Sequence, residues 1–272
     1  MGQGLHGCER AARSVIMLSM ATASAAAVPD REPELLGQTV VLIGGSAGMG
    51  LETARRARAE GAAVILAGRD PGRLRDAAAE VGALRTAAFD AADPAALERF
   101  FGELPTPVDH VMVTAGGPYY ALLADLDRER AHRDFDEHLW LAIEVARQSV
   151  GRVRPGGTLL FLGGTGGRRP GPGLSLVSAA TAAMPALVAS LAVEVAPIRV
   201  NLIAAGFVDT PLSASLLGDD LDRRRDQLRA TLPIGRVVGP ADVAALAVHL
   251  MSNTALTGAT YDIDGGQQLI PA

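Results

Sequence analysis

Short apolar runs alternate with helical segments along most of the chain. The apolar runs, which we predict to be strands, are residues 40–43, 63–67, 84–89, 108–114, 158–162, 198–204 and 259–263. The segments predicted to be helices are residues 52–60, 71–81, 94–104, 128–153, 178–195 and 241–251. This alternation is typical of a parallel sheet joined by right-handed crossovers, and nearly continuous apolar strands indicate that both faces are covered. We predict an α/β fold with a doubly wound parallel sheet, in a single domain of residues 35–272.

Residues 1–34 do not continue this pattern. Arg10 precedes a mildly apolar stretch, residues 14–28, which permits an interpretation as a signal peptide. Polar residues interrupt the stretch, its charged start is weak, and Met17 or Met20 would serve as a later start of the chain. We therefore favour a disordered or mis-assigned leader over secretion.

Charge and composition point away from nucleic-acid and membrane partners. The chain is 49% hydrophobic and 20% charged, with a net charge of −5 and no long basic or acidic run. The basic cluster Arg223-Arg224-Arg225 alternates with aspartates, so we predict that it is a solvated helix face. The single cysteine, Cys8, permits no disulfide framework, and a reducing cytoplasmic compartment fits this usage.

A long uncharged stretch near the middle of the chain invites a membrane-spanning interpretation. Residues 174–195 carry no charge before Glu194. Serine, threonine and proline interrupt the stretch, and it is rich in alanine. We predict instead a helix of small residues that is packed on both sides inside the protein.

A glycine-rich turn follows the first predicted strand and leads at once into a helix. Its residues are Gly44, Gly45, Ser46, Ala47, Gly48, Met49 and Gly50. Glycine lets the backbone turn sharply and lets a ligand approach closely, while a helix N-terminus offers unpaired N–H groups and the positive end of a dipole. A purely structural turn is the alternative, but the strand before and the helix after favour a bound dinucleotide.

Glycine or polar residues also end other predicted strands, where ligands bind in such sheets. These residues are Arg69, Asp90, Ala115-Gly116, Gly163-Gly164 and Gly206. The guanidinium of Arg69 suits the 2′-phosphate of NADP. Asp70 leaves NAD open, or instead caps the helix that begins at Pro71. We predict NADP(H) in preference to NAD.

Several motifs resemble those of the short-chain dehydrogenase/reductase family, from about residue 36 to the C-terminus. Residues 43–50 are similar to the family's TGxxxGxG turn, with Ile43 in place of the threonine. Asp90, Ala115-Gly116 and Thr210 match an adenine-contacting aspartate, the end of an NNAG motif and the last residue of PGxxxT. The resemblance implies a Rossmann-type sheet, cofactor contacts at Asp90, Ala115 and Gly116, and contact of Thr210 with the nicotinamide amide.

The catalytic residues of that family do not recur. The family uses Asn, Ser, Tyr and Lys, and the lysine lowers the pKa of the tyrosine that exchanges a proton with the substrate. The aligned positions hold His138, Gly164, Val177 and Thr181. Valine has no proton to give, threonine has no charge, and residues 165–200 contain neither tyrosine nor lysine. The resemblance therefore implies cofactor binding without the family's standard mechanism.

Three side chains are candidates for proton transfer: His138, Tyr119 and Tyr120. Imidazole titrates near neutral pH, and the tyrosine pair follows a glycine turn that can border the nicotinamide. The structural alternatives are a helix histidine that fills the space of the missing asparagine, and an aromatic pair that lines the cleft. Thr165 and Arg168 would contact a polar substrate group or only shape their loop. We predict no metal site.

Residues 212–232 match the variable substrate loop of the family. Its leucines suggest an apolar lid over the cofactor, and such a lid favours an apolar or aromatic carbonyl-like substrate. Three functions remain open: an atypical NADP(H)-dependent oxidoreductase acting on a small carbonyl or alcohol-like substrate, an inactive NADP-binding homologue that serves as a sensor or partner subunit, and a non-redox enzyme on the same fold. We favour the first. The resemblance also implies a homodimer or homotetramer.

Overall fold

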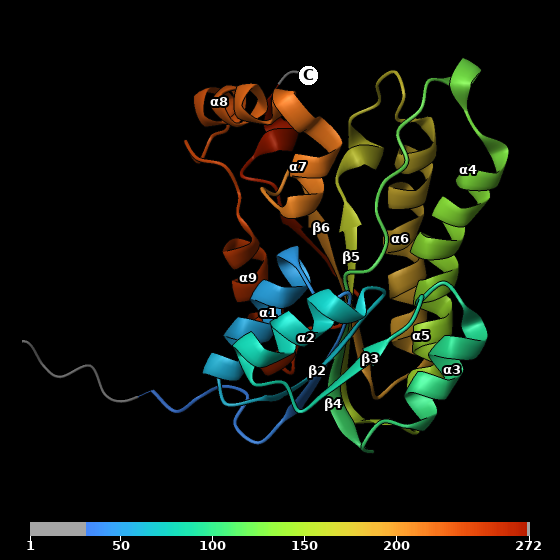
Figure 1. The fold of residues 1–272 in the computed structure, drawn as a ribbon, viewed down its shortest axis with the longest axis vertical. Coiled ribbons are helices and arrows are strands. Elements are labelled where there is room, and N and C mark those ends of the chain that lie inside the picture. The colour runs from blue at the N-terminus through green and yellow to red at the C-terminus, as the bar shows by residue number, and fades with distance from the viewer. Residues whose placement is uncertain (1–30, 271–272) are drawn as a thin grey trace, which may run out of the picture. The chain divides into compact units, whose positions relative to one another are not determined.

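Seven parallel strands form the centre of the fold, in the order β3-β2-β1-β4-β5-β6-β7 (Figure 1). The structure is a computed structural model and describes residues 31–270, so the predicted leader lies almost entirely outside the described residues. The strands are β1 (Thr39–Ile43), β2 (Ala63–Gly68), β3 (Arg85–Ala88), β4 (Val108–Val113), β5 (Val153–Gly164), β6 (Arg199–Ala205) and β7 (Thr260–Ile263). The chain reverses its direction of winding between β1 and β4, which is where such sheets bind ligands.

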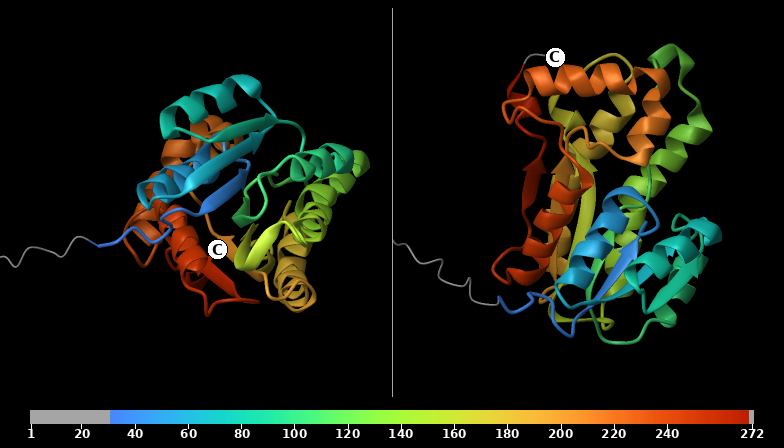
Figure 2. Two further views of the ribbon diagram at one scale, coloured as in Figure 1. Left: turned by 90° about the horizontal axis from the view of Figure 1, so that it is seen from below. Right: turned by 60° about the vertical axis from the view of Figure 1, so that its left-hand side comes forward.

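Helices cover both faces of the sheet (Figure 2). They are α1 (Gly48–Ala59), α2 (Pro71–Val81), α3 (Pro94–Gly102), α4 (Arg128–Phe135), α5 (Leu141–Ser149), α6 (Ser175–Glu194), α7 (Pro211–Leu217), α8 (Leu221–Thr231) and α9 (Pro240–Ser252). Helices α1, α2 and α9 share a core with Val40 and Leu42 of β1, whereas α3, α5 and α6 share the other core with Val41 and Ile43. Alternate residues of β1 therefore point to opposite cores, and the predicted doubly wound α/β fold is confirmed.

Two predicted elements differ from the structure. The helix predicted over residues 128–153 is interrupted by a π-helix, Asp136–Trp140, and ends at Ser149. Strand β5 begins at Val153 instead of residue 158, because Val153 pairs with Val108 ahead of an irregularity in the ladder. Strand β5 therefore begins at the last residue of the predicted helix and adds residues 154–157, which the pattern had assigned to neither element.

Aspartate and proline set the starts of α2 and α3. Asp70 Oδ1 accepts hydrogen bonds from the N–H groups of Gly72 at 2.8 Å and Arg73 at 3.0 Å. Asp93 caps α3 in the same way, and proline occupies the first turn of both helices. The interpretation of Asp70 as a helix cap is therefore confirmed.

Helix α6 is long and apolar enough to cross a membrane, by length and composition alone. Its buried residues recur at helical spacing and are Val177, Ala180, Thr181, Met184, Val188 and Leu191. This face packs into the core beside β5 and β6, which identifies α6 as a covering helix of the sheet. Ala182, Ala186 and Val193 are exposed, so the prediction of packing on both sides is wrong within the single chain.

Candidate active site

The glycine turn between β1 and α1 is held tightly against the end of β4. Thr114 Oγ1 donates a hydrogen bond to the carbonyl oxygen of Gly44 at 3.0 Å. A Cβ on Gly50 would lie 2.3 Å from that same oxygen, and a Cβ on Gly44 would lie 2.5 Å from Thr114 Oγ1. The turn therefore closes only with glycine at both positions.

The turn leads directly into α1, and the first N–H groups of this helix are available to a ligand. Ala47, the residue before the helix, makes no side-chain capping hydrogen bond, and the first turn contains no acidic residue. Helix N-termini attract anions through these N–H groups and through the helix dipole. The cradle therefore fits the pyrophosphate of a dinucleotide.

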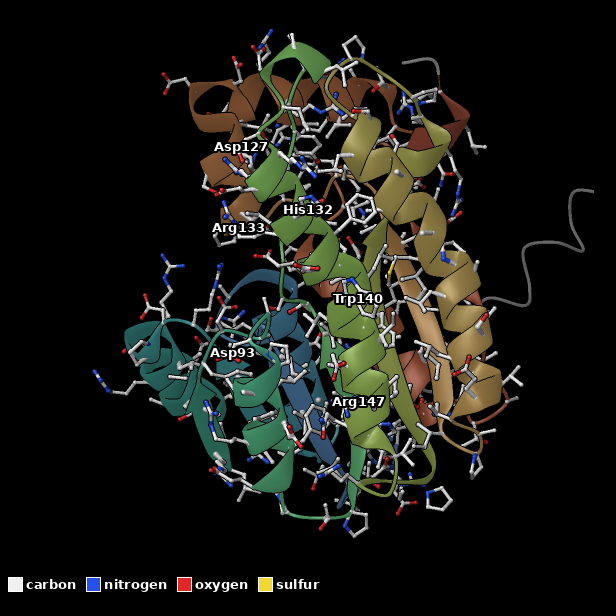
Figure 3. The ribbon with its side chains drawn as sticks, turned by 90° about the vertical axis from the view of Figure 1, so that its right-hand side faces the viewer. Asp93, Asp127, His132, Arg133, Trp140 and Arg147 are labelled. Atoms are coloured by element: carbon white, nitrogen blue, oxygen red, sulfur yellow. The ribbon has the colours of Figure 1, made fainter. Side chains whose placement is uncertain are left out.

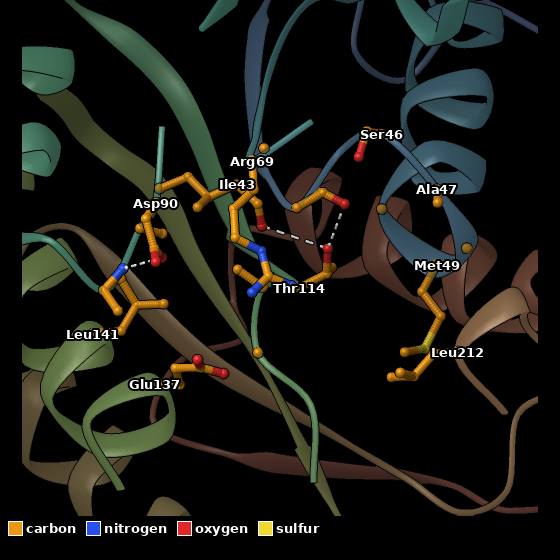
Figure 4. A pocket seen from close by; sticks show the side chains of 18 of the residues that line it. Ile43, Ser46, Ala47, Met49, Arg69, Asp90, Thr114, Glu137, Leu141 and Leu212 are labelled. Carbon is orange, nitrogen blue, oxygen red and sulfur yellow. Dashed lines mark hydrogen bonds between the residues drawn. The ribbon is translucent and has the colours of Figure 1, made fainter. Parts of the chain in front are cut away.

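A smaller cavity of about 210 Å³ lies against this turn (Figure 4). The predicted cofactor residues that line it are Gly44, Ser46, Ala47, Gly48, Met49, Gly50, Arg69, Asp90, Ala115, Gly116 and Thr210. Gly45 does not line it, because this residue packs inward, where a Cβ would meet Leu42 and Leu66 at 2.9 Å. Apart from Gly45, the structure brings the predicted cofactor residues together.

Arg69 and Asp70 have different surroundings at the end of β2. Arg69 is exposed and lines the smaller cavity, and no carboxylate of residues 31–270 forms an ion pair with it. The Asp70 carboxylate turns to the start of α2, where the hydrogen bond from the Arg73 N–H holds the pKa of Asp70 below its ordinary value. A guanidinium without a carboxylate partner at the edge of a cavity suits a phosphate group.

A larger cavity of about 650 Å³ continues from the smaller one. Both cavities are lined by Met49, Thr114, Ala115, Gly116, Glu137, Leu141, Thr210 and Leu212. His138, Gly164, Val177 and Thr181, which the sequence resemblance matched to the family's catalytic positions, all line the larger cavity. Thr181 Oγ1 donates to the carbonyl oxygen of Val177 at 2.7 Å, so its proton is held by the backbone.

The π-helix Asp136–Trp140 brings Glu137 and His138 to the wall of the larger cavity. Such wide turns are frequent at functional sites. His138 Nδ1 is 2.7 Å from the carbonyl oxygen of Asp134. Because a carbonyl oxygen can only accept, Nδ1 carries the hydrogen. Nε2 has no hydrogen-bond partner among the described residues and is free to exchange a proton with a ligand.

A buried carboxylate lies beside this histidine. Asp134 Oδ1 accepts from the N–H of Tyr119 at 3.0 Å and lies 3.7 Å from His138 Nδ1. Its Oδ2 is buried without a hydrogen-bond partner in the described part of the chain. Burial raises the pKa of the Asp134 carboxyl, and the neighbouring His138 partly opposes this shift.

The adjacent residues Tyr119 and Tyr120 differ in their contacts. The Tyr119 hydroxyl accepts from the N–H of Asp127 at 3.0 Å, and the guanidinium of Arg130 lies 4.5 Å from the centre of its ring. Tyr119 lines neither cavity, so its hydroxyl is misplaced for the predicted proton transfer. Tyr120 lines the larger cavity and is 52% exposed, and the burial of the rest of its surface raises the pKa of its phenol.

Several side chains of the larger cavity escaped the sequence prediction. They are Glu137, Arg169, Arg224 and Gln267. The prediction of a solvated face is wrong for Arg224, which turns inward. Thr165 lines the cavity but Arg168 does not, because Arg168 pairs with Asp262. Within residues 31–270, His, Cys, Asp and Glu form no group of three or more that would hold a metal ion.

Helices α7 and α8, which span most of the segment predicted to form a lid, border one side of the larger cavity. Leu212, Leu216 and Leu217 line it, whereas Leu221 and Leu228 do not. Thr210 caps α7 by accepting from the N–H of Ser213 at 3.2 Å. The same threonine lines both cavities, so the lid begins at the cofactor side of the site.

The chain is similar to dehydrogenases and reductases over nearly its whole described length. The family model described as enoyl-(acyl carrier protein) reductase matches residues 44–268. Short-chain dehydrogenase/reductase ATR9 of Stachybotrys chlorohalonatus is 29% identical, covering 86% of this chain and 98% of the relative. The 4-formylbenzenesulfonate dehydrogenase of Comamonas testosteroni is 29% identical, covering 85% and 98%. The NADP-dependent (R)-specific alcohol dehydrogenase of Lentilactobacillus kefiri is 27% identical, covering 85% and 97%.

Solved structures share the fold. The MalC reductase/Diels-Alderase from Malbranchea aurantiaca superposes with a TM-score of 0.82 at 25% identity, covering 88% of this chain and 99% of that one. A small-chain dehydrogenase in complex with NADPH superposes with a TM-score of 0.74 at 26% identity, covering 86% and 99%. The range matched by the family model includes both the glycine turn and the residues of the larger cavity from Met49 to Gln267.

Proposed function

The chain belongs to the short-chain dehydrogenase/reductase family, and we propose that it is an NADP(H)-dependent oxidoreductase that interconverts a small carbonyl compound and its alcohol. Relatives named for aldehyde and alcohol oxidation support this reaction class. The observation that carries the proposal is the free Nε2 of His138 at the wall of a cavity that continues from the dinucleotide cradle.

The proposed cofactor is NADP(H) in preference to NAD(H). Arg69 is available for the 2′-phosphate, and Asp70, the neighbouring acid, is occupied as a helix cap. The cradle would hold the pyrophosphate, with Asp90 beside the adenine and Thr210 beside the nicotinamide amide. A relative named as NADP-dependent and a similar structure that contains NADPH support this choice.

When bound, the reduced cofactor supplies a hydride to the carbonyl carbon of the substrate. His138 Nε2 then gives its proton to the carbonyl oxygen. In the family this is the role of the tyrosine whose aligned position here holds Val177. In the direction of alcohol oxidation, neutral Nε2 takes that proton back. Nδ1 stays bonded to the carbonyl oxygen of Asp134 in both directions and fixes the ring. The Asp134 carboxylate acts through the histidine, because its Oδ1 lies 3.7 Å from Nδ1 and helps to hold the ring in place.

Tyr120 is the second proton donor that we consider. Burial, and secondarily the negative charge of Asp134, raise the pKa of its phenol, so Tyr120 stays protonated through neutral pH. A reduction that uses Tyr120 would therefore proceed at a constant rate across neutral pH.

The test begins with NADPH binding, followed by a screen of carbonyl, enoyl and imine compounds for loss of NADPH absorbance. With a reactive compound, we expect His138→Gln to lower kcat by about 10²- to 10⁴-fold, the usual contribution of a positioned acid. The Kd for NADPH should stay unchanged, since His138 lines only the larger cavity. Tyr120→Phe is the matched control on the same cavity wall, and it should retain most activity.

Other outcomes assign a different function. Tight NADPH binding without turnover across the screen would contradict the oxidoreductase proposal and favour the inactive homologue. Turnover of a compound without a change in NADPH absorbance would favour a non-redox enzyme. Val177 and Thr181 at the aligned positions, and a similar protein named as both a reductase and a Diels-Alderase, give weight to that second candidate.

We also propose that copies of the chain associate as a homodimer or homotetramer through α4, α5 and α6. Trp140, which lies on the helical side of the molecule drawn in Figure 3, is 58% exposed, and Val193 near the end of α6 is 79% exposed. Val193→Glu should shift the mass measured by light scattering toward the monomer. Leu84→Glu, which changes an exposed leucine before β3, should leave it unchanged. The cytoplasmic location stays a prediction.

A further inference from the structure

Two arginines from separate parts of the chain meet at the larger cavity. Arg169 comes from the loop after β5, and Arg224 comes from α8 of the lid. Arg169 Nη1 donates to the backbone oxygen of Gln267 at 2.8 Å, and Arg224 Nη1 donates to Gln227 Oε1 at 2.8 Å. Neither guanidinium forms an ion pair with a carboxylate of residues 31–270.

The neighbouring arginines show that carboxylate partners are otherwise plentiful. Arg223 pairs with Asp220 at 2.8 Å, and Arg225 pairs with Asp209 and Asp222 at 2.8 Å. Of the three consecutive arginines on α8, the one that turns to the cavity is the one without an acidic partner. Arg168 and Arg169 differ in the same respect: Arg168 pairs with Asp262, whereas Arg169 lines the cavity.

Arg224 keeps its positive charge in a partly buried position. Its guanidinium is half-buried and lies 6.0 Å from the centre of the Phe207 ring. Burial lowers the pKa of Arg224, and the positive charge of Arg169 lowers it further. Two unpaired cations in a partly buried site are unfavourable until an anion joins them.

The rest of this cavity is mostly apolar around the two cations. Its apolar lining includes Pro170, Leu174, Phe207, Leu216 and Leu217. The acidic residue on the wall, Glu137, lies near Gly116, where a Cβ would be 3.7 Å from its Oε2. Within the glycine turn, Met49 is the residue that reaches this cavity, so the phosphate cradle is separate from the arginine pair.

We propose that the larger cavity binds an organic carboxylate, with the carboxylate held by Arg169 and Arg224 and an apolar body lying along Phe207 and the lid leucines. This substrate class rests on the proposed function for the reaction at its other end, where the carbonyl would face His138. Arginine suits the part because its planar fork binds both carboxylate oxygens.

Equilibrium binding tests the proposal without turnover. We would titrate 4-methylbenzoate and its neutral analogue 4-methylbenzamide into the full chain with NADP⁺ present, using calorimetry. The acid should bind at least about tenfold more tightly than the amide, as expected for charge-assisted hydrogen bonds. Arg169→Gln and Arg224→Gln should each abolish most of this preference. Arg223→Gln, which removes the same charge one residue away, should keep it.

A second measurement does not depend on the folding of the variants. With the native chain, added salt should weaken binding of the acid and leave binding of the amide nearly constant. The carboxylate proposal would be overturned if the acid failed to bind or bound no more tightly than the amide. It would also be overturned if Arg223→Gln lost the preference for the acid as fully as Arg169→Gln and Arg224→Gln.

Turnover then separates this inference from the proposed function. Selective binding of the acid, with no oxidation of NADPH when 4-carboxybenzaldehyde is added, would count against the proposed oxidoreductase activity alone. Suppose instead that 4-carboxybenzaldehyde and 4-formylbenzamide are turned over equally and that Arg224→Gln changes neither rate. That result would count against the proposed carboxylate site alone and would leave the proposed oxidoreductase activity in place.

Discussion

Acid should destabilise the fold through one buried histidine, His110 of β4. This residue is 0% exposed, and its Nε2 donates to Gln38 Oε1 at 2.6 Å. Its Nδ1 is buried without a hydrogen-bond partner in the described part of the chain. Burial lowers the pKa of His110 to about 3, with Asp109 opposing the shift and Arg154 and Arg199 adding to it.

The sign and size of the effect follow from this pKa. The unfolded chain binds a proton on this histidine below about pH 6.5, whereas the folded chain does so only near pH 3. The free energy of unfolding therefore falls as the pH drops through this window, by about 1.4 kcal/mol per pH unit. At pH 5 the loss attributable to His110 is about 2 kcal/mol.

Urea unfolding at several pH values between 7.5 and 5 measures this loss. His110→Gln keeps a side chain that can donate to Gln38 and removes the titration, so its free energy of unfolding should depend less on pH by the stated amount. His132→Gln, at an exposed histidine of α4, is the control and should follow the native curve. Parallel curves for native protein and His110→Gln would refute the reasoning.

Three further predictions concern the cofactor cradle and the end of α9. Arg69→Ala should weaken NADPH binding by about tenfold or more and leave NADH nearly unchanged, measured by fluorescence titration; equal effects would remove the 2′-phosphate role. Gly50→Ala should abolish cofactor binding and lower Tm, because its Cβ would lie 2.3 Å from the Gly44 oxygen. Gly102→Ala is the control and should retain cofactor binding and the native Tm, because no atom lies within 4 Å of a Cβ there. Arg199→Met should cost about 3 kcal/mol or more of unfolding free energy, because it removes hydrogen bonds to the backbone oxygens of residues 250, 251, 253 and 256; a loss under about 1 kcal/mol in urea would contradict this.

The positions of the strands could be predicted because they depend on local apolar runs, and their alternation with helices indicated a parallel sheet. Strand ends of this kind lie at one edge of a parallel sheet, so the amino-acid sequence alone was enough to place the glycine turn, Arg69 and Asp90 together. The limits of β5 could not be predicted, because residues 153–157 show no strand pattern. Val153 joins the sheet through pairing with Val108, a distant residue in the chain.

The walls of the larger cavity were harder to predict, since they depend on side-chain direction. The local charge alternation around Arg224 indicates a solvated helix, and only the position of α8 over the sheet turns that one arginine inward. Tyr119 and Tyr120 are neighbours without helical or strand periodicity to separate them. Contacts with Asp127 and Arg130 hold the first away from the cavity.

The dipeptide Arg69-Asp70 has a consequence for protein engineering. Arg69, the proposed cofactor contact, and Asp70, which caps α2, are consecutive residues, so a designer can change position 69 without removing the helix cap. Conversion to NADH use should be built at position 69, where an acid would meet the ribose hydroxyls. Recruiting Asp70 for that purpose would leave the first N–H groups of α2 uncapped and trade helix integrity for cofactor choice.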